Sequence, residues 1–296
     1  MTIRNSALRS DEDRGISVVV PTCNRGDYLR EAVQSALAQT VDIREVIVVD
    51  DASDHDPRPQ LSDLGDKVKV HRLPTRSGAN VARNVGIEMA RGFWVALLDD
   101  DDIWLPEKTE TQLNAMGLEG KTAARPQAAL DVEACLCIAQ DVGGPPDTPR
   151  NIADISERLR KENPCGTSGL IARRALLLEE PFDVTLRRAQ DWDIFVRLSK
   201  RGRLILVEKP LYLRRVGHDR ITTNALRQTP DELFGTAAAA THKHREWLGE
   251  PAYRRRIAIV MLSYISQRER KLRYILASIR HAGLIATLGV LMSKLR

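Results

Sequence analysis

Four consecutive aspartates, Asp99 to Asp102, directly follow an apolar run that ends at Leu98. Like charges this close repel one another, and a divalent cation relieves the repulsion. Carboxylate oxygens suit Mg²⁺ or Mn²⁺, which enzymes acting on phosphates hold with one or two carboxylates plus substrate oxygens. A calcium EF-hand is excluded because its sixth loop position needs glycine and holds Trp104 here. The run predicts metal-assisted phosphate chemistry; the alternative is a solvated acidic turn.

Two further polar pairs also end runs rich in β-branched residues. Pro21 and Thr22 end the first run, and Asp50 and Asp51 end the second. Between the runs, apolar residues recur at helical spacing, so the order is strand, helix, strand, helix, strand. The expected strands cover residues 16–20, 46–49, 68–70 and 93–98, and the expected helices cover 29–37 and 79–91.

This alternation predicts an α/β fold, a mostly parallel sheet flanked by helices on both faces. Ligands of such sheets bind beyond the carboxyl ends of the strands. All three polar clusters stand at those ends, so we expect them to meet along one edge of the sheet.

Composition and charge favour a globular protein that does not bind nucleic acid. Of 296 residues, 43% are hydrophobic and 29% charged, which is ordinary for a folded domain. Residues 250–296 hold ten Lys/Arg against two Asp/Glu, a formal charge of +8. The whole chain has a formal charge of +5, so residues 1–249 carry a net charge of −3. The basic charge therefore belongs to the tail, and it lacks the aromatic interleaving of nucleic-acid surfaces.

The cysteines and the N-terminus predict a reduced, cytoplasmic protein. Cys23, Cys135, Cys137 and Cys165 form no C-x-x-C pair, and Cys135 and Cys137 share one face of an expected strand. Residues 1–15 have no apolar core, so we expect a disordered lead rather than a signal peptide.

Several segments carry a resemblance to a known family. The chain is similar to family 2 glycosyltransferases of the GT-A (Rossmann-like) fold. The likeness is close between Ile16 and Leu113, looser through His218, and spans roughly two thirds of the chain. It rests on the segments ISVVVPTCNRGDYLREAVQSALAQT, EVIVVDDAS, GANVARNVGIEMARGFWVALLDDDDIWLPEKTETQL, CGTSGLIARRAL and RRAQDWDIFVRLSKRG.

The resemblance implies a domain division. It places a glycosyltransferase domain at residues 16–225, with a nucleotide-binding half at 16–115 and an acceptor half at 116–225. A helical, basic C-terminal region follows at 226–296.

The resemblance also implies a donor site. Asp51 corresponds to the carboxylate that reads the nucleobase, and Pro21, Thr22 and Asn24 are assigned to the same donor pocket. Asp50 then closes the strand and supports the loop, with a turn cap as the alternative. Arg83 stands either against the diphosphate, which suits a guanidinium, or in a structural salt bridge.

The acidic run matches the D-x-D element of the family. Asp101 corresponds to the metal ligand, Asp99 is counted with it, and Asp100 lies against the donor ribose or the metal. Asp102 is explained equally well as a cap of the next helix. His218 resembles a histidine that closes over metal and diphosphate in some relatives.

A base completes the implied chemistry. A carboxylate with an ordinary pKa of about 4 is ionised at neutral pH and can accept a hydroxyl proton. Asp191, in Gln190-Asp191-Trp192-Asp193, matches the family's E-D or Q-D element that carries the base. An N-cap is the alternative for Asp191, and Asp193 is the fallback as base. Trp192 lines the acceptor or belongs to the core.

The tail leaves two interpretations open. Apolar residues at helical spacing between basic residues suit a helix lying on an anionic bilayer. The other interpretation is a helix pair packed on the catalytic domain or on a second subunit, which would make a homodimer. The stretch from Tyr274 to Met292 falls short of a membrane span because Arg280 and His281 interrupt it.

Together with the acidic run, the resemblance implies a metal-dependent, inverting glycosyltransferase of the hexosyltransferase type. It would use Mn²⁺ or Mg²⁺ to transfer sugar from a UDP- or GDP-sugar to a hydroxyl of a glycan or lipid-linked acceptor. Synthesis of cell-surface polysaccharide, lipopolysaccharide or another glycan is the expected setting, in the cytoplasm or peripherally on the inner face of the membrane. The alternatives are a nucleotidyltransferase of nucleotide-sugar metabolism and a non-catalytic membrane-surface relative.

Overall fold

The computed structural model describes residues 15–118, 132–144, 155–215 and 228–294. The chain divides into two compact units. The first comprises Met1–Asn151, Pro164–Phe182 and Leu198–Val216; the second comprises Ile152–Asn163, Asp183–Arg197 and Gly217–Arg296. The predicted disordered lead lies almost wholly outside the described residues.

The described part of the first unit is built on one eight-stranded sheet with the strand order β3-β2-β1-β4-β7-β6-β8-β5. β3, β2, β1 and β4 are parallel neighbours, and β6 is parallel to β8, whereas the other neighbours are antiparallel. The strands are β1 (Ile16–Thr22), β2 (Ile43–Asp50), β3 (Val68–Arg72), β4 (Trp94–Leu97), β5 (Asp102–Trp104), β6 (Val132–Asp141), β7 (Ile171–Arg173) and β8 (Arg203–Arg214). This confirms the predicted mostly parallel sheet.

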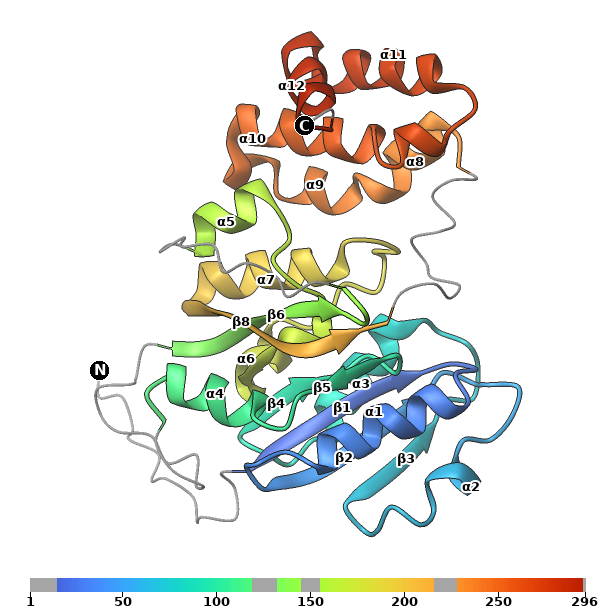
Figure 1. Cartoon of the computed structure of the whole chain (residues 1–296), viewed down its shortest axis with the longest axis vertical. Helices are drawn as coiled ribbons and strands as arrows, with labels where there is room; N and C mark the ends of the chain where they lie inside the picture. Colours follow the sequence, from blue (N-terminus) through green and yellow to red (C-terminus); the bar gives the residue numbers. More distant parts are fainter. Residues whose placement is uncertain (1–14, 119–131, 145–154, 216–227, 295–296) are drawn as a thin grey trace. The chain divides into compact units, whose positions relative to one another are not determined.

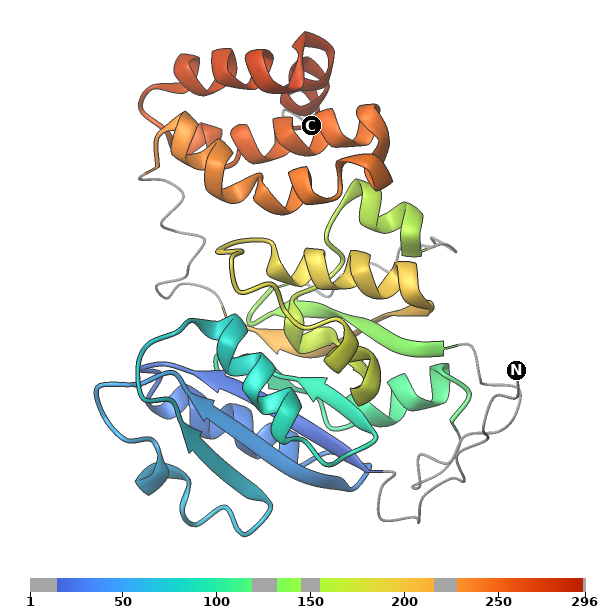
Figure 2. The ribbon, with the colours of Figure 1, turned by 180° about the vertical axis from the view of Figure 1, so that it is seen from behind.

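Helices cover both faces of this sheet, as predicted for an α/β fold. Figure 1 shows α1 in front of β1 and β2, and Figure 2, seen from behind, shows α3 in front. Gly86 lets α3 approach β1 closely, because a Cβ there would lie 2.3 Å from Val19 Cγ1. The helices of this unit are α1 (Asp27–Leu37), α2 (Arg58–Leu61), α3 (Ala79–Met89), α4 (Lys108–Ala115) and α6 (Arg174–Glu179).

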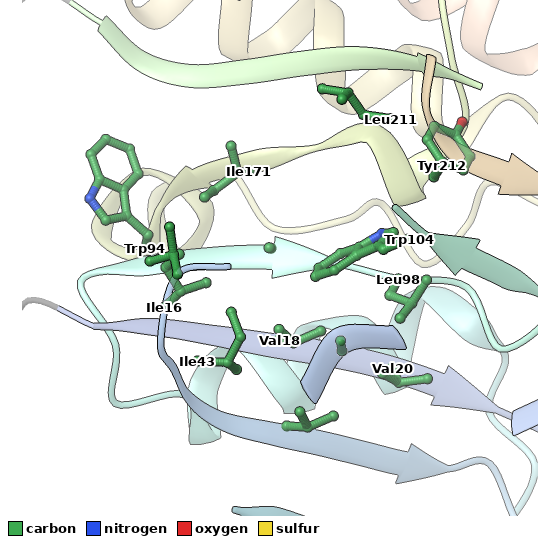
Figure 3. Close-up of a cluster of buried hydrophobic side chains, with 14 of the residues drawn as sticks. Ile16, Val18, Val20, Ile43, Trp94, Leu98, Trp104, Ile171, Leu211 and Tyr212 are labelled. Carbon is green, nitrogen blue, oxygen red and sulfur yellow. The ribbon is translucent and has the colours of Figure 1, made fainter. Parts of the chain in front are cut away.

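The core explains why the central strands have nearly continuous apolar sequences. β1 is buried along its whole length because helices pack on both of its faces. Figure 3 shows side chains from β1, β2, β4, β5, β7 and β8 gathered into one cluster, including Trp94, Trp104 and Tyr212. Cys135 and Cys137 are buried in β6, as their spacing predicts.

The short antiparallel strands were not expected from the sequence. β5 and β7 have three residues each, too few for a period of two to be read. β5 changes the interpretation of Asp102. This residue is buried, and in the strand register it lies opposite Arg214 of β8. The alternative that Asp102 caps the next helix is wrong, because α4 has Glu107 at its N-cap position.

The described part of the second unit is helical, which confirms the predicted helical C-terminal region. It contains α5 (Ile155–Lys161), the start of α7 (Gln190–Arg201), α8 (Pro230–Ala237), α9 (Ala239–Lys243), α10 (Arg245–Met261), α11 (Lys271–Ala282) and α12 (Leu284–Lys294). Among the described residues, no helix combines the length and the apolar character needed to cross a membrane.

Candidate donor and catalytic site

The predicted meeting of polar clusters at one edge of the sheet is confirmed. β1, β2 and β4 run parallel, and their register places Thr22 beside Asp50. The Asp51 amide donates to the Thr22 carbonyl at 2.8 Å, and the Leu98 amide donates to the Val19 carbonyl at 3.0 Å. The chain therefore leaves all three strands along one edge, as ligand-binding α/β sheets do.

Asp50 and Asp51 have different surroundings although they are adjacent. Asp50 is fully buried and its Oδ1 accepts from the amide and the hydroxyl of Ser53, so it caps the turn after β2 and holds that loop. Asp51 accepts from two backbone amides, Ser77 N at 2.6 Å and Gly78 N at 2.8 Å. Its carboxylate thereby ties the end of β2 to the loop that opens α3.

The loop after β1 is fixed by the loop after β2. The Asn24 amide donates to Ser53 Oγ at 2.8 Å, and Asn24 Nδ2 donates to Asp54 Oδ2 at 3.0 Å. In return, the Asp54 amide donates to Asn24 Oδ1 at 2.8 Å. Both polar ends of the Asn24 side chain thus hold the loop, while Pro21 and Thr22 are buried at the end of β1.

The four aspartates diverge instead of forming one cluster. Asp99 accepts from Thr167 Oγ1 at 2.7 Å and pairs with Arg83 Nη2 at 2.7 Å. Asp102 turns inward, where it accepts from Ser168 Oγ at 2.6 Å. Asp99 and Asp102 therefore anchor the run to the segment before β7, and Asp100 and Asp101 are left toward the loop after β1.

Asp100 and Asp101 share one positive group, the guanidinium of Arg25. Arg25 Nε donates to Asp100 Oδ1 at 3.0 Å, and Arg25 Nη2 lies 3.5 Å from Asp101 Oδ2. Burial raises the pKa of Asp100 to about 7, although Arg25 and the Thr22 hydroxyl favour its ionised form. Asp101 and Asp99 add to the rise by repulsion. Burial, more than the neighbouring charges, therefore opposes the ionised form of Asp100.

Arg83 is buried and forms the salt bridge that was one of its two predicted roles. Its guanidinium pairs with Asp99, donates to Asn80 Oδ1 at 3.2 Å, and lies 5.4 Å from the centre of the Phe182 ring. Arg83 lies on the buried face of α3, and from there its side chain reaches Asp99 at the end of β4. Its contact with a diphosphate stays a prediction.

Asp191 lies in the second unit, in the first turn of α7. Asn163 Nδ2 donates to Asp191 Oδ2 at 2.8 Å, and the Trp192 amide donates to Asp191 Oδ1 at 2.8 Å. The alternative that Asp191 is the N-cap is wrong, since α7 already begins at Gln190. Its role as base stays a prediction.

The neighbours of Asp191 are structural. Trp192 is fully buried and donates through Nε1 to the Leu159 carbonyl at 2.8 Å, so it belongs to the core. Asp193 is also buried and pairs with His244, Arg197 and Lys243. Burial opposes its ionisation, but these partners hold the pKa of Asp193 below its ordinary value. His218 lies outside the described residues.

Comparisons with known proteins match this architecture. Residues 17–130 match the sequence model described as Glycosyl transferase family 2. The chain therefore contains a region similar to family 2 glycosyltransferases. It is 40% identical over 104 residues to the putative teichuronic acid biosynthesis glycosyltransferase TuaG of Bacillus subtilis, covering 34% of this chain and 41% of that protein. It is 30% identical over 189 residues to an uncharacterized glycosyltransferase of Haemophilus influenzae, covering 62% of this chain and 61% of that protein.

Solved structures that are similar to this chain share its fold. The structure of S. aureus TarS 1-349 in complex with UDP-GlcNAc has a TM-score of 0.58 at 20% identity, covering 92% of this chain and 89% of that one. The mannosyltransferase PcManGT of Pyrobaculum calidifontis, in complex with GDP-Man and Mn²⁺, has a TM-score of 0.59 at 19% identity, covering 97% and 82%. The likeness establishes a GT-A type fold.

The acidic edge of the sheet fits a divalent cation held mainly by substrate. Among the described residues, no group of three His, Cys, Asp or Glu side chains is arranged to hold a metal. Asp99 and Asp102 are engaged by Arg83, Thr167 and Ser168. Asp100 and Asp101 lie side by side against Arg25, and such a carboxylate pair suits ions that take one or two carboxylates and complete their shell with phosphate oxygens.

Asp100→Asn should stabilise the metal-free protein at pH 8 by about 2 kcal/mol, or roughly 4 to 8 °C in melting temperature. A raised pKa means that the folded state keeps a proton that the unfolded state has lost. Wild-type stability therefore falls as the pH rises from about 4 to 7, and the variant lacks this loss.

Thermal unfolding of both proteins in EDTA at pH 5 and pH 8 checks this prediction, and the gain should be larger at pH 8. The control is Asp63→Asn. In the wild-type protein Arg30 holds the pKa of the exposed Asp63 carboxyl at about 2, so its replacement should not stabilise the protein. A variant Asp100→Asn that melts at or below the wild-type temperature at pH 8 would contradict the assignment of buried, poorly compensated charge.

The structure adds residues that the sequence did not reveal. Arg25 faces the acidic run, Thr167 and Ser168 anchor it, and Asn163 holds Asp191. Thr167 and Ser168 belong to the segment CGTSG that carries the family resemblance, so a signal was present without a role. Arg25 and Asn163 are single polar residues in loops, and only the folded chain brings them to their partners.

Proposed function

We propose that this chain is an inverting glycosyltransferase that moves a sugar from a UDP- or GDP-sugar to a hydroxyl group. The observation that carries the proposal is the acidic edge of the sheet, where Asp51, Asp100 and Asp101 stand at the ends of parallel strands within the matched region. TarS was solved with UDP-GlcNAc and PcManGT with GDP-Man and Mn²⁺, which supports a nucleotide-sugar donor.

In this proposal the nucleotide binds along the edge of the sheet. The Asp51 carboxylate keeps lone pairs beyond those used by Ser77 and Gly78, so it can also accept from a nucleobase N–H. Pro21 and Thr22 shape the same pocket. Arg83 and Asn24 also belong to the proposed donor site. Arg83 positions Asp99, and Asn24 positions the loop after β1.

Transfer then needs a proton acceptor and a stabilised leaving group. A divalent cation held by Asp101, with Asp99 and His218 as the further predicted ligands, would neutralise charge on the departing diphosphate. Asp191 would accept the proton of the attacking hydroxyl while Asn163 keeps its carboxylate oriented. One displacement without a covalent intermediate inverts the anomeric configuration.

The donor assignment is tested with purified protein, Mn²⁺ and a panel of nucleotide sugars that includes UDP-GlcNAc and GDP-Man. We expect nucleotide release from one base type, lost on addition of EDTA. Release from none of them, or release unaffected by EDTA, would overturn the donor or the metal respectively. The acceptor is proposed to be a growing cell-surface glycan or its lipid-linked precursor, since TuaG is named for teichuronic acid biosynthesis.

We further propose that α11 and α12 bind an anionic bilayer on the inner face of the membrane. Six large apolar residues of these helices are exposed although Tyr274, Ser278, Thr287 and Val290 are buried. Residues 271–294 contain Lys271, Arg273, Arg280 and Lys294 and no acidic residue. Apolar side chains among basic residues suit a surface of anionic headgroups. The exposed set is Leu272, Leu276, Leu284, Ile285, Leu288 and Met292.

The double variant Leu276→Glu/Ile285→Glu should bind vesicles containing phosphatidylglycerol at least tenfold more weakly than wild type. Burial of one leucine or isoleucine is worth about 1.5–3 kcal/mol, and the new carboxylates are repelled by the headgroups. Co-sedimentation at low and high salt measures the loss. Leu178→Glu, at an exposed leucine of α6, is the control. Equal binding of both variants, or a wild-type dimer that hides this surface, would contradict the proposal.

A further inference from the structure

Arg25 occupies an unusual place beside the acidic run. Its guanidinium joins two carboxylates that follow one another in the chain, through Nε to Asp100 at 3.0 Å and through Nη2 to Asp101 at 3.5 Å. The side chains of Asp100 and Asp101 are only 10% and 15% exposed, whereas Arg25 is 28% exposed. The guanidinium therefore covers the acidic pair from the solvent side.

A rigid turn directs Arg25 to this position. The residues on either side, Asn24 and Gly26, both have positive φ, at 58° and 52°. Asn24 is held in that conformation by Ser53 and by its reciprocal bonds with Asp54. The turn is thus fixed by β2 and its loop, and the long side chain of Arg25 is the part that can change conformation.

The guanidinium and a divalent cation would compete for the same carboxylates. Arginine stays protonated in proteins, so Arg25 cannot leave the pair by losing its charge. A cation that binds Asp101 must break an ion pair with partly buried partners. Binding of the cation alone is therefore weakened by the cost of displacing Arg25.

We propose that Arg25 is a displaceable counter-ion that couples metal binding to nucleotide binding. Without a cation it neutralises Asp100 and Asp101; when the cation binds, the guanidinium is released. A released guanidinium suits the two oxygens of a diphosphate. Nucleotide and cation then bind more tightly together than either does alone, which is a coupling between two ligands. This inference rests on the proposed use of a metal and a nucleotide diphosphate.

The test compares wild type, Arg25→Gln and a control, Arg30→Gln, which removes an arginine of α1 that pairs with Asp63. Free Mn²⁺ is followed by electron paramagnetic resonance, with Mn²⁺ alone and with Mn²⁺ plus UDP or GDP. We expect Arg25→Gln to bind Mn²⁺ alone about tenfold more tightly, because the competing cation is gone. The gain in Mn²⁺ affinity that nucleotide gives should fall by about the same factor.

The melting temperature gives a second measurement that needs no activity. Arg25→Gln leaves Asp100 and Asp101 without their counter-ion, so Mn²⁺ alone should raise its melting temperature more than that of wild type. Unchanged Mn²⁺ affinity in Arg25→Gln, with wild type binding Mn²⁺ and nucleotide, would overturn the counter-ion role and leave the proposed function intact. Absence of Mn²⁺ binding by wild type, with or without nucleotide, would overturn this inference and the proposed use of a metal.

Discussion

Asp191→Asn should reduce turnover about a hundredfold or more while nucleotide binding stays unchanged. The amide has the shape of the carboxylate but cannot take the proton of the attacking hydroxyl. Its oxygen can still accept from the Trp192 amide, and its NH₂ group can donate to Asn163 once that side-chain amide rotates, so the start of α7 should keep its structure. Initial rates of nucleotide release in the presence of acceptor, together with nucleotide affinity by calorimetry, measure the two effects separately.

A matched control lies two residues along the same helix. Asp193→Asn neutralises a carboxylate that is buried with His244, Arg197 and Lys243, and breaking such a pair typically costs about 3–5 kcal/mol. It should lower the melting temperature, whereas Asp191→Asn should not. Wild-type turnover in Asp191→Asn would remove Asp191 from the role of base. A large loss of stability in that variant would show a structural role instead.

Asp101→Ala should abolish the part of nucleotide affinity that depends on Mn²⁺. Asp99, although a further predicted ligand, is fixed by Arg83 and Thr167, and Asp102 is held by Ser168, so neither can move to the position of Asp101. Loss of the principal carboxylate should weaken binding in Mn²⁺ by at least tenfold and leave binding in EDTA unchanged. Calorimetric titration with UDP and with GDP under both conditions measures the difference.

The control for this variant is Asp42→Ala, an exposed aspartate that pairs with Lys67 at 2.5 Å. It should bind nucleotide like wild type under both conditions. If Asp101→Ala kept full Mn²⁺-dependent affinity, the cation would have to be held elsewhere, and the assignment of the D-x-D element would be wrong.

Much of the fold could be predicted because its central strands are chemically distinctive. A parallel strand buried on both faces must be apolar throughout, and β1, β2 and β4 have such sequences. The edge where their polar ends meet follows from parallel pairing alone. β5 and β7 could not be predicted, because three residues show no alternation and their partners lie far along the chain.

The candidate site was predictable in its residue types and not in its contacts. The negative charge of the acidic run was evident from the sequence. The sequence could not show that two of its members, Asp99 and Asp102, accept hydrogen bonds from Thr167 and Ser168. Arg25 is one of many arginines until the turn at Asn24 and Gly26 aims it at Asp100. Trp192 was ambiguous because an aromatic residue beside a catalytic acid suits an acceptor wall and a core equally well.

A manganese anomalous map from crystals grown with Mn²⁺ and UDP or GDP tests the acidic edge most directly. We expect an anomalous peak within about 2.3 Å of an Asp101 oxygen and of the diphosphate, with Arg25 turned away from Asp100. Bound nucleotide without manganese at Asp101, or manganese bound away from this edge, would contradict the account.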